Sequence, residues 1–306
     1  MHRHPRPGAE PGLLVVDKPA GMTSHDVVAR TRKIMGTRKV GHAGTLDPMA
    51  TGVLVVGVER ATKLLGHLSL DRKSYLATIA LGASTGTDDA EGDVLTAAEP
   101  GDLEAVTAGA IDTAITELTG PIEQVPSAVS AVKVDGVRAY ERVRAGEDVE
   151  LDARPVTVHR FDRLALRGTS GTRSGRVELD VLVDCSSGTY VRALARDLGA
   201  ALGVGGHLAA LRRTTVGPFG LATARTLDEL SEHPTLSLDL DESVATAFPT
   251  VEVGASTARA VRHGQRVPAT GREGTYAFVD EDGRALALAT DEGHRSKLLV
   301  VLAPAS

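Results

Sequence analysis

The sequence contains one cysteine, no tryptophan, four phenylalanines and four tyrosines among 306 residues. Cys185 has no partner for an intramolecular disulfide, so a disulfide-stapled scaffold is excluded. No run approaches the ~18 consecutive apolar residues that a membrane helix requires. The N-terminus, MHRHPRPGAEPG, is basic and rich in Pro and Gly but lacks an apolar signal core. We therefore expect residues 1–11 to form a flexible tail on a cytoplasmic protein.

The chain also lacks the common motifs for nucleotides, zinc and serine hydrolysis. It has no G-x-x-x-x-G-K-[ST], no G-x-G-x-x-G after a strand, no C-x-x-C and no G-x-S-x-G. Near His42 no second His or Cys stands at ligand spacing, so no metal site is predicted. A hydrophobic content of 42% and a charged content of 24% are typical of globular proteins. Of the broad classes of protein, a folded enzyme or a folded binding protein is left.

Charge is distributed unevenly along the chain. The net charge of −6 argues against a general nucleic-acid binder, because such domains usually carry a basic excess. Residues 1–75 hold twelve Lys and Arg against six acids, a net charge of +6, which leaves −12 for the remainder. This distribution is consistent with a local site for a polyanion. Ordinary scatter of surface charge explains it equally well.

Helices and strands are predicted in a mixed order without a βαβ repeat, which favours an α+β fold. A strand at 13–16 runs into a turn, and a helix capped by Thr23 or Ser24 ends at Gly36. From about residue 236 the pattern changes to a small, mostly β domain. Further helices are expected near 61–68, 102–119, 139–145 and 189–202, and further strands near 52–58, 74–81, 156–166, 176–185, 276–280, 284–290 and 297–302.

The segment 41–52 has neither helical nor strand periodicity and is predicted to be a loop. Its three glycines and Pro48 frame a single carboxylate, Asp47, which the following proline keeps out of helical geometry. A carboxylate held at a fixed angle suits nucleophilic or acid–base chemistry, although Asp before Pro is more often a turn former or cap. In the same loop, His42 is a candidate general base or stacking group, and its interpretation as a metal ligand is set aside because no second ligand stands nearby.

Two later segments carry further candidates. Tyr75 begins an apolar strand, where a lone Tyr is usually a core residue with its hydroxyl at the rim. Tyr190 and Arg192 open a helix, where Arg192 is suited to a buried carboxylate and Tyr190 to packing over a ring; both are equally ordinary for a helix surface. Arg212 and Arg213 are adjacent cations, for which a solvated face is the usual explanation.

The ordered set of these segments resembles bacterial tRNA pseudouridine-55 synthases, the TruB family of pseudouridine synthases. The resemblance covers about residues 12–220, and its most specific part is the GHAGTLDP-x-A-T-G run at 41–52. Val129 and the pair Val143-Arg144 depart from the family pattern. The matching runs are 14–26, 39–54, 61–64, Tyr75 with 82–92, 130–133, 154–156, 188–192 and 207–214.

The resemblance implies an enzyme that isomerises the T-loop uridine at position 55 of transfer RNA without a cofactor or metal. The N1 glycosidic bond is cut and C1′ of the ribose is rejoined to C5 of uracil. The implied fold is the α+β pseudouridine-synthase fold, with a mixed, mainly antiparallel sheet and a catalytic cleft. The implied catalytic domain is 12–235, and a PUA-like RNA-binding domain follows at 249–306. The partner is tRNA, and the protein is expected to be a monomer that needs no protein partner.

The resemblance also assigns roles at the reacting base. Asp47 matches the catalytic aspartate, either as a nucleophile or on a glycal-type path. Tyr75 matches the residue that stacks on the uracil and is a candidate for removing the C5 proton. Arg192 matches the arginine that pairs with the aspartate, and Tyr190 and Leu211 match the walls of the pocket.

Binding roles follow from the same comparison. His42 matches the residue that enters the T loop in place of the flipped base, since a base inside a folded loop must be extruded to react. The basic first quarter, with Lys18 and Lys39, is expected to hold tRNA phosphates together with Arg212. Two alternatives stay open: a pseudouridylase subunit that depends on guide RNA and partner proteins, and an RNA-binding or tRNA-folding module with secondary catalysis. The joint presence of Asp47, Tyr75 and Arg192 argues against lost catalysis.

Overall fold

The computed structural model describes residues 9–68, 72–127, 133–134, 137–138, 151–168 and 177–305. The chain forms two compact units, of which the first comprises Met1–Leu70 with Thr215–Ser306 and the second Asp71–Thr214. Each unit is a mixture of helices and mostly antiparallel strands. The α+β class expected from the sequence is confirmed.

The first unit is built on hydrophobic strands that are buried on both faces. β1 (Gly12–Lys18) pairs antiparallel with β3 (Thr51–Val58) and β14 (Leu238–Asp239), and β2 (Val40–Ala43) also pairs with β3. Because side chains alternate along a strand, each face of β1 and β3 joins a different hydrophobic cluster. Leu14, Val16, Leu54 and Val56 belong to one cluster, and Leu13, Val15, Val53 and Val55 to the other.

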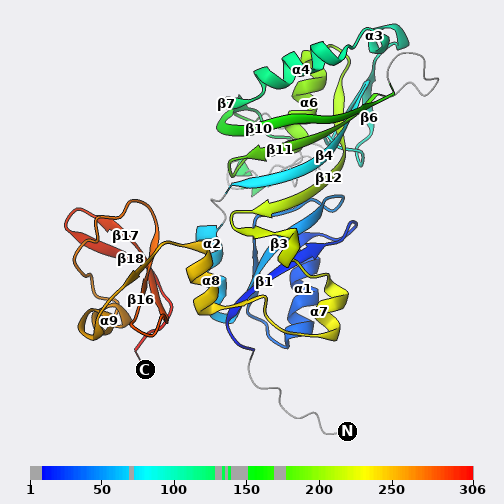
Figure 1. Cartoon of the computed structure of the whole chain (residues 1–306). Coiled ribbons are helices and arrows are strands. Elements are labelled where there is room, and N and C mark those ends of the chain that lie inside the picture. Colours follow the sequence, from blue (N-terminus) through cyan, green and yellow to red (C-terminus); the bar gives the residue numbers. More distant parts are fainter. Residues whose placement is uncertain are drawn as a thin grey trace, which may run out of the picture. The chain divides into compact units, whose positions relative to one another are not determined.

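The helix α1 (Ser24–Met35) covers one of these clusters and has the caps that its sequence predicts. Thr23 and Asp26 form a capping box at its N-terminus, and Gly36 ends it in the left-handed region at φ 68°. Its own residues Val27 and Val28 are buried in this cluster. In Figure 1, α1 and α7 (Leu227–Glu232) lie side by side.

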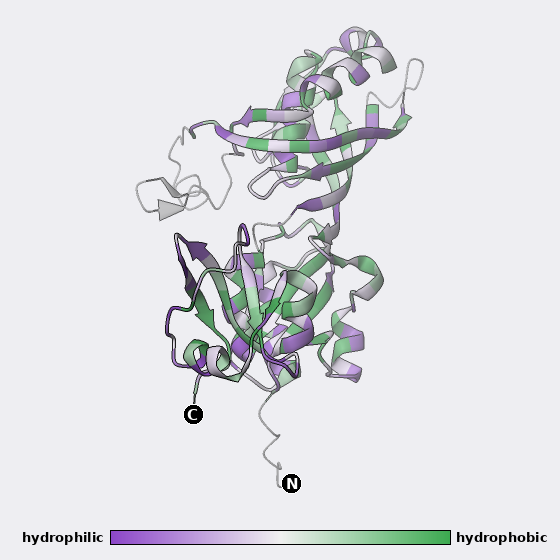
Figure 2. Ribbon diagram, turned by 60° about the vertical axis from the view of Figure 1, so that its left-hand side comes forward, coloured by the Kyte–Doolittle hydropathy of each residue, from purple (hydrophilic) through white to green (hydrophobic). Residues whose placement is uncertain are grey.

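The C-terminal segment shares a core with the first strands of the chain. Leu288 and Leu302 lie in the same hydrophobic cluster as Leu13 and Val53. The first compact unit therefore continues across residue 235. The expected division into a catalytic domain at 12–235 and a PUA-like domain at 249–306 stays a prediction. The elements of this C-terminal segment are α8 (Leu240–Ala247), β15 (Thr250–Glu252), α9 (Ala255–Arg262), β16 (Tyr276–Val279), β17 (Ala285–Glu292) and β18 (Arg295–Val301). Its sheet has the order β15-β16-β17-β18. Figure 2 shows hydrophobic segments along the strands of this unit.

The second unit is a sheet covered by helices. Its strands run in the order β12-β4-β11-β10-β7, with antiparallel pairing along β4-β11-β10-β7. Alternate residues of β11 are buried, as expected for a sheet with one covered face. The helices α4 (Ala108–Glu117) and α6 pack together, α4 on β10 and α6 on β4 (Figure 1). The strands are β4 (Lys73–Leu81), β7 (Gly120–Gln124), β10 (Arg154–Arg167), β11 (Val177–Cys185) and β12 (Gly206–Val216), and the helix α6 is Val191–Ala201.

Two helix predictions need correction. The helix expected at 102–119 is two helices, α3 (Pro100–Glu104) and α4 (Ala108–Glu117), because the Thr107 side chain accepts from the Ala110 amide and starts a new helix. The helix expected at 61–68 is half 3-10 helix, through Leu64, and half α-helix, from Leu65 to Leu68. The helix expected at 139–145 lies outside the described residues. The remaining short elements are η1 (Glu59–Leu64), α2 (Leu65–Leu68), β5 (Ala83–Thr85), β6 (Val94–Ala97), β8 (Lys133–Val134), β9 (Val137–Arg138), β13 (Phe219–Gly220) and η2 (Leu221–Thr223).

No helix within the described part of the chain has the length and apolar character needed to cross a membrane.

A polar network fastens one loop to the C-terminal sheet. The hydroxyl of fully buried Tyr276 donates to Asp291 Oδ1 at 2.5 Å, and Asp291 Oδ2 accepts from the amides of Thr270 and Gly271 at 2.8 and 2.7 Å. The Tyr276 hydrogen bond, helped by the backbone amides, lowers the pKa of Asp291 from 3.8 to about 2. The ionised carboxylate is therefore part of the folded state.

Replacing Asp291 is expected to make the thermal stability of the fold depend less on pH in the acid range. Since the folded pKa is depressed, the contribution of Asp291 is complete above its usual pKa and disappears as the pH falls through about 2. Asp291→Asn should unfold at lower temperature than wild type at pH 7, and this difference should shrink below about pH 4. Thermal unfolding across pH measures it, with exposed Asp282→Asn as the control. A difference that stays constant with pH would contradict the assignment.

Candidate active site

Asp47 lies in a short loop between two paired strands of the first unit. The loop predicted at 41–52 is shorter than expected, because β2 extends through Ala43 and pairs with β3, His42 opposite Val56. Gly44 adopts φ 76°, a left-handed turn that favours glycine, and the Ala50 amide donates to the Asp47 carbonyl at 3.1 Å. Asp47 itself is half-buried.

Ser24 fastens this loop on the N-terminal side of Asp47. Its hydroxyl donates to the Leu46 carbonyl at 3.1 Å and accepts from the Leu46 amide at 2.9 Å. Ser24 is 1% exposed and Leu46 4% exposed, so water does not compete for these bonds. Both backbone groups of the residue before Asp47 are therefore held by the first residue of α1.

Lys18 fastens the loop on the other side of Asp47. Its ammonium is fully buried and donates to the carbonyls of Pro19, Met22 and Pro48 at 2.9, 2.5 and 3.2 Å. The Gly21 amide also donates to the Pro48 carbonyl, at 2.8 Å. The sequence assigned Lys18 to tRNA phosphates, whereas its burial and these bonds place it behind the loop. A buried ammonium requires such partners, because leaving it without them is costly.

The other two binding candidates of this unit lie on or beside β2. His42 is half-buried, and its ring meets the ring of His25 edge to face, with centroids 5.4 Å apart. The Lys39 side chain is 76% exposed and pairs with Glu59 at 3.5 Å. The exposure of Lys39 is compatible with a phosphate contact.

In the second unit Arg192 is paired with a carboxylate that the sequence did not single out. Arg192 Nε lies 3.6 Å from Asp89 Oδ2, and Arg192 Nη1 donates to the Thr87 carbonyl at 2.8 Å. The two side chains are only 5% and 6% exposed. The Glu91 amide and the Thr87 hydroxyl also donate to Asp89, which fixes its orientation. The expected pairing of Arg192 with Asp47 stays a prediction.

Tyr75, Leu211 and Arg212 come from neighbouring strands. Tyr75 is on β4, opposite Val183 of β11, and is 7% exposed. β12, which carries Leu211 and half-buried Arg212, is the next strand on the other side of β4. Leu211 is 9% exposed.

Tyr190 is held at the start of α6 by a residue of β7. The Gln124 side chain accepts from the Tyr190 amide at 2.8 Å and donates to the Tyr190 carbonyl at 3.1 Å. Gln124 is 2% exposed, so this pair of bonds is built into the interior. It fixes the backbone two residues before Arg192.

The structure thus sorts the candidates by unit. Asp47, His42, Lys18 and Lys39 belong to the first unit, and Tyr75, Tyr190, Arg192, Leu211 and Arg212 to the second. Sequence reasoning missed Ser24, His25, Asp89 and Gln124, whose partners are distant in the chain. Asp89 stood in an acidic loop with nothing to distinguish it from Asp88.

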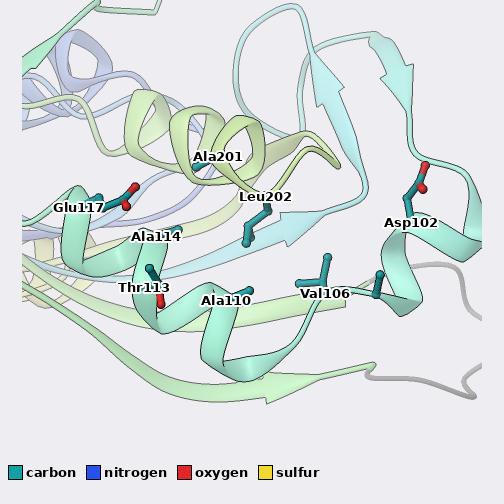
Figure 3. Close-up of a pocket in the computed structure, with 9 residues that line it drawn as sticks. Asp102, Val106, Ala110, Thr113, Ala114, Glu117, Ala201 and Leu202 are labelled. Carbon is teal, nitrogen blue, oxygen red and sulfur yellow. The ribbon is translucent and has the colours of Figure 1, made fainter.

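A separate groove in the second unit contains none of these candidates. It encloses about 390 Å³ between α3, α4 and the end of α6, with Ala114 and Leu202 among its lining residues (Figure 3). Among the described residues no cluster of three or more His, Cys, Asp or Glu is placed to hold a metal ion. The thiol of Cys185 is buried on β11, which raises its pKa to about 11.

Comparison with known proteins covers nearly the whole chain. Residues 32–191 match the model of the TruB family pseudouridylate synthase N-terminal domain. Residues 192–246 match that of the tRNA pseudouridylate synthase B C-terminal domain, and 248–303 that of the C-terminal region of tRNA pseudouridine synthase II. A protein named tRNA pseudouridine synthase B from Mycobacteroides abscessus is 58% identical over 98% of this chain and 99% of its own length. The protein of that name from Nocardia farcinica is 62% identical over 96% and 94%.

Two solved structures are also similar. A Cbf5–Nop10–Gar1 complex matches with a TM-score of 0.73 and 28% identity, covering 97% of this chain and 86% of that one. An H/ACA ribonucleoprotein bound to a substrate RNA containing 2′-deoxyuridine matches with a TM-score of 0.70 and 25% identity, covering 96% and 85%. The fold is therefore that of a pseudouridine synthase.

The chain belongs to the TruB family of pseudouridine synthases. It is an isomerase that forms pseudouridine in transfer RNA.

Removing the carboxylate of Asp89 is expected to slow the reaction. Asp89→Asn takes away the ion pair that orients Arg192, and a small displacement in an active site costs about 100-fold in kcat. The free energy of unfolding should fall by about 1–3 kcal/mol. Steady-state kinetics and urea unfolding measure both. The matched control is Asp88→Asn, which removes the partner of more exposed Arg196 and should keep wild-type kcat. A wild-type kcat for Asp89→Asn would contradict this role.

Removing the Ser24 hydroxyl is expected to loosen the Asp47 loop. Ser24→Ala leaves both backbone groups of Leu46 without their partner, at a cost of about 1–3 kcal/mol in unfolding free energy. Because Leu46 precedes Asp47, single-turnover pseudouridine formation should slow by about 10- to 100-fold while tRNA binding is retained. Ser243→Ala, which removes an equally buried hydroxyl that donates to the Asp239 carbonyl at the start of α8, should lose stability without losing rate. Equal rates for the two variants would refute the effect.

Proposed function

We propose that the protein isomerises the T-loop uridine at position 55 of transfer RNA, with Asp47 as its catalytic carboxylate. The observation that carries this proposal is the clamped loop, in which Ser24 and Lys18 hold the residues on either side of Asp47. A loop fixed in this way presents one carboxylate with little freedom to move. Preorganisation of this kind is what a reacting group requires.

The reaction exchanges one bond for another without an added reactant. The N1–C1′ bond breaks, the C1′–C5 bond forms, C5 loses its proton and N1 gains one. Asp47 acts either as a nucleophile or by stabilising a glycal-type path. No oxidant or reductant is needed, because substrate and product are isomers.

The proposal includes extrusion of the target base from the T loop. Extrusion costs a few kcal/mol and requires both a surface for the flipped base and a group to fill the space that it leaves. Tyr75 offers its ring to the uracil and is a candidate for removing the C5 proton. His42 enters the T loop, while Tyr190 and Leu211 line the pocket around the base.

Phosphate contacts are assigned to the exposed cations. Lys39 and Arg212 are proposed to hold the tRNA backbone, so that affinity falls as the salt concentration rises. Arg192 is proposed to act in catalysis through its charge, with Asp89 fixing its orientation. The enzyme is proposed to act as a monomer. It is also proposed to need no partner protein, since the relatives of 58% and 62% identity carry the name of a single enzyme.

A tritium-release experiment tests the function. An unmodified tRNA transcript carrying tritium at uracil C5 should release one equivalent on incubation with the wild-type protein, and the product should map to the T-loop uridine. Asp47→Asn should bind the tRNA but react at least about 10³-fold more slowly. Asp228→Asn, an exposed carboxylate on α7, should react like wild type. Tight tRNA binding by wild type without release would instead support the binding-module alternative.

A further inference from the structure

An aromatic pair joins α1 to β2 beside the Asp47 loop. The rings of His25 and His42 have centroids 5.4 Å apart and planes at 88°. Edge-to-face contact at this distance is one of the two arrangements that aromatic rings prefer. His25 is exposed in the first turn of α1, and His42 is half-buried on β2. Side chains from two different elements therefore meet at the surface.

The backbones that carry the two rings are fixed independently of the ring contact. Thr23 and Asp26 cap α1, and Ser24 ties the helix to Leu46. The strand ladder between β2 and β3 places His42 opposite Val56. The ring contact therefore restricts the side-chain torsions of the two histidines, because other contacts already hold their backbones.

We propose that His25 is a positioning residue that holds the imidazole of His42 in the orientation in which it enters the tRNA T loop. This inference rests on the proposed role of His42. A side chain that becomes ordered on binding loses rotamer freedom, and holding it beforehand reduces that loss. His25 does not act on the reacting bond. Its effect therefore belongs in substrate binding, with the chemical step unchanged.

Four variants test the proposal: His25→Ala, His25→Phe, His42→Ala and the double alanine variant. KM for tRNA and kcat are measured for each, and thermal unfolding checks that all four fold. His25→Ala should raise KM by about 2- to 10-fold, the size expected from one aromatic contact, with kcat unchanged. His25→Phe preserves a ring at the same place and should keep a KM near that of wild type. The double variant should match His42→Ala, because His25 acts only through His42.

The other outcomes separate two kinds of failure. If His42→Ala leaves KM unchanged, the proposed role of His42 is wrong and the positioning role fails with it. If His42→Ala raises KM but His25→Ala does not, the positioning role alone is overturned. Additive effects in the double variant would show that His25 acts independently of His42 and would overturn it as well. A His25→Phe variant with a KM as high as that of His25→Ala would also overturn the positioning role.

Discussion

Buried polar contacts on both sides of Asp47 fix the position of the loop that carries it. The buried ammonium of Lys18 is satisfied by the carbonyls of Pro19, Met22 and Pro48, and Ser24 holds both backbone groups of Leu46. These bonds lie in the interior, where unpaired polar groups are costly. The strands β1 and β3 are buried on both faces and support the loop, so that their packing sets its position.

Buried polar residues also hold the proposed functional side chains of the second unit. Gln124 holds the backbone of Tyr190, and Asp89 pairs with Arg192 in surroundings with little water. In each case a buried polar residue from a distant part of the chain orients a group proposed to meet the substrate. Precision at the site thus comes from polar contacts inside a hydrophobic framework, as the low exposure of Gln124 and Arg192 indicates.

Features set by neighbouring residues were predictable from sequence. The caps of α1 at Thr23 and Gly36 are local, and alternation predicted β4 and β11. The helix at 102–119 was wrong because one threonine, Thr107, starts a second helix. The family resemblance supplied the candidates of the site, but not their supports. Ser24 lies 22 positions from Leu46, and the burial of Lys18 could not be predicted because composition says nothing about burial.

Amide hydrogen exchange at Leu46, in the free protein and in its complex with tRNA, tests most directly whether the Asp47 loop is preorganised. This amide should exchange slowly before any substrate is added, because it donates to buried Ser24, and tRNA should change the rate by less than about tenfold. Rapid exchange in the free protein, with protection only when tRNA is bound, would show that the substrate orders the loop and would contradict the account.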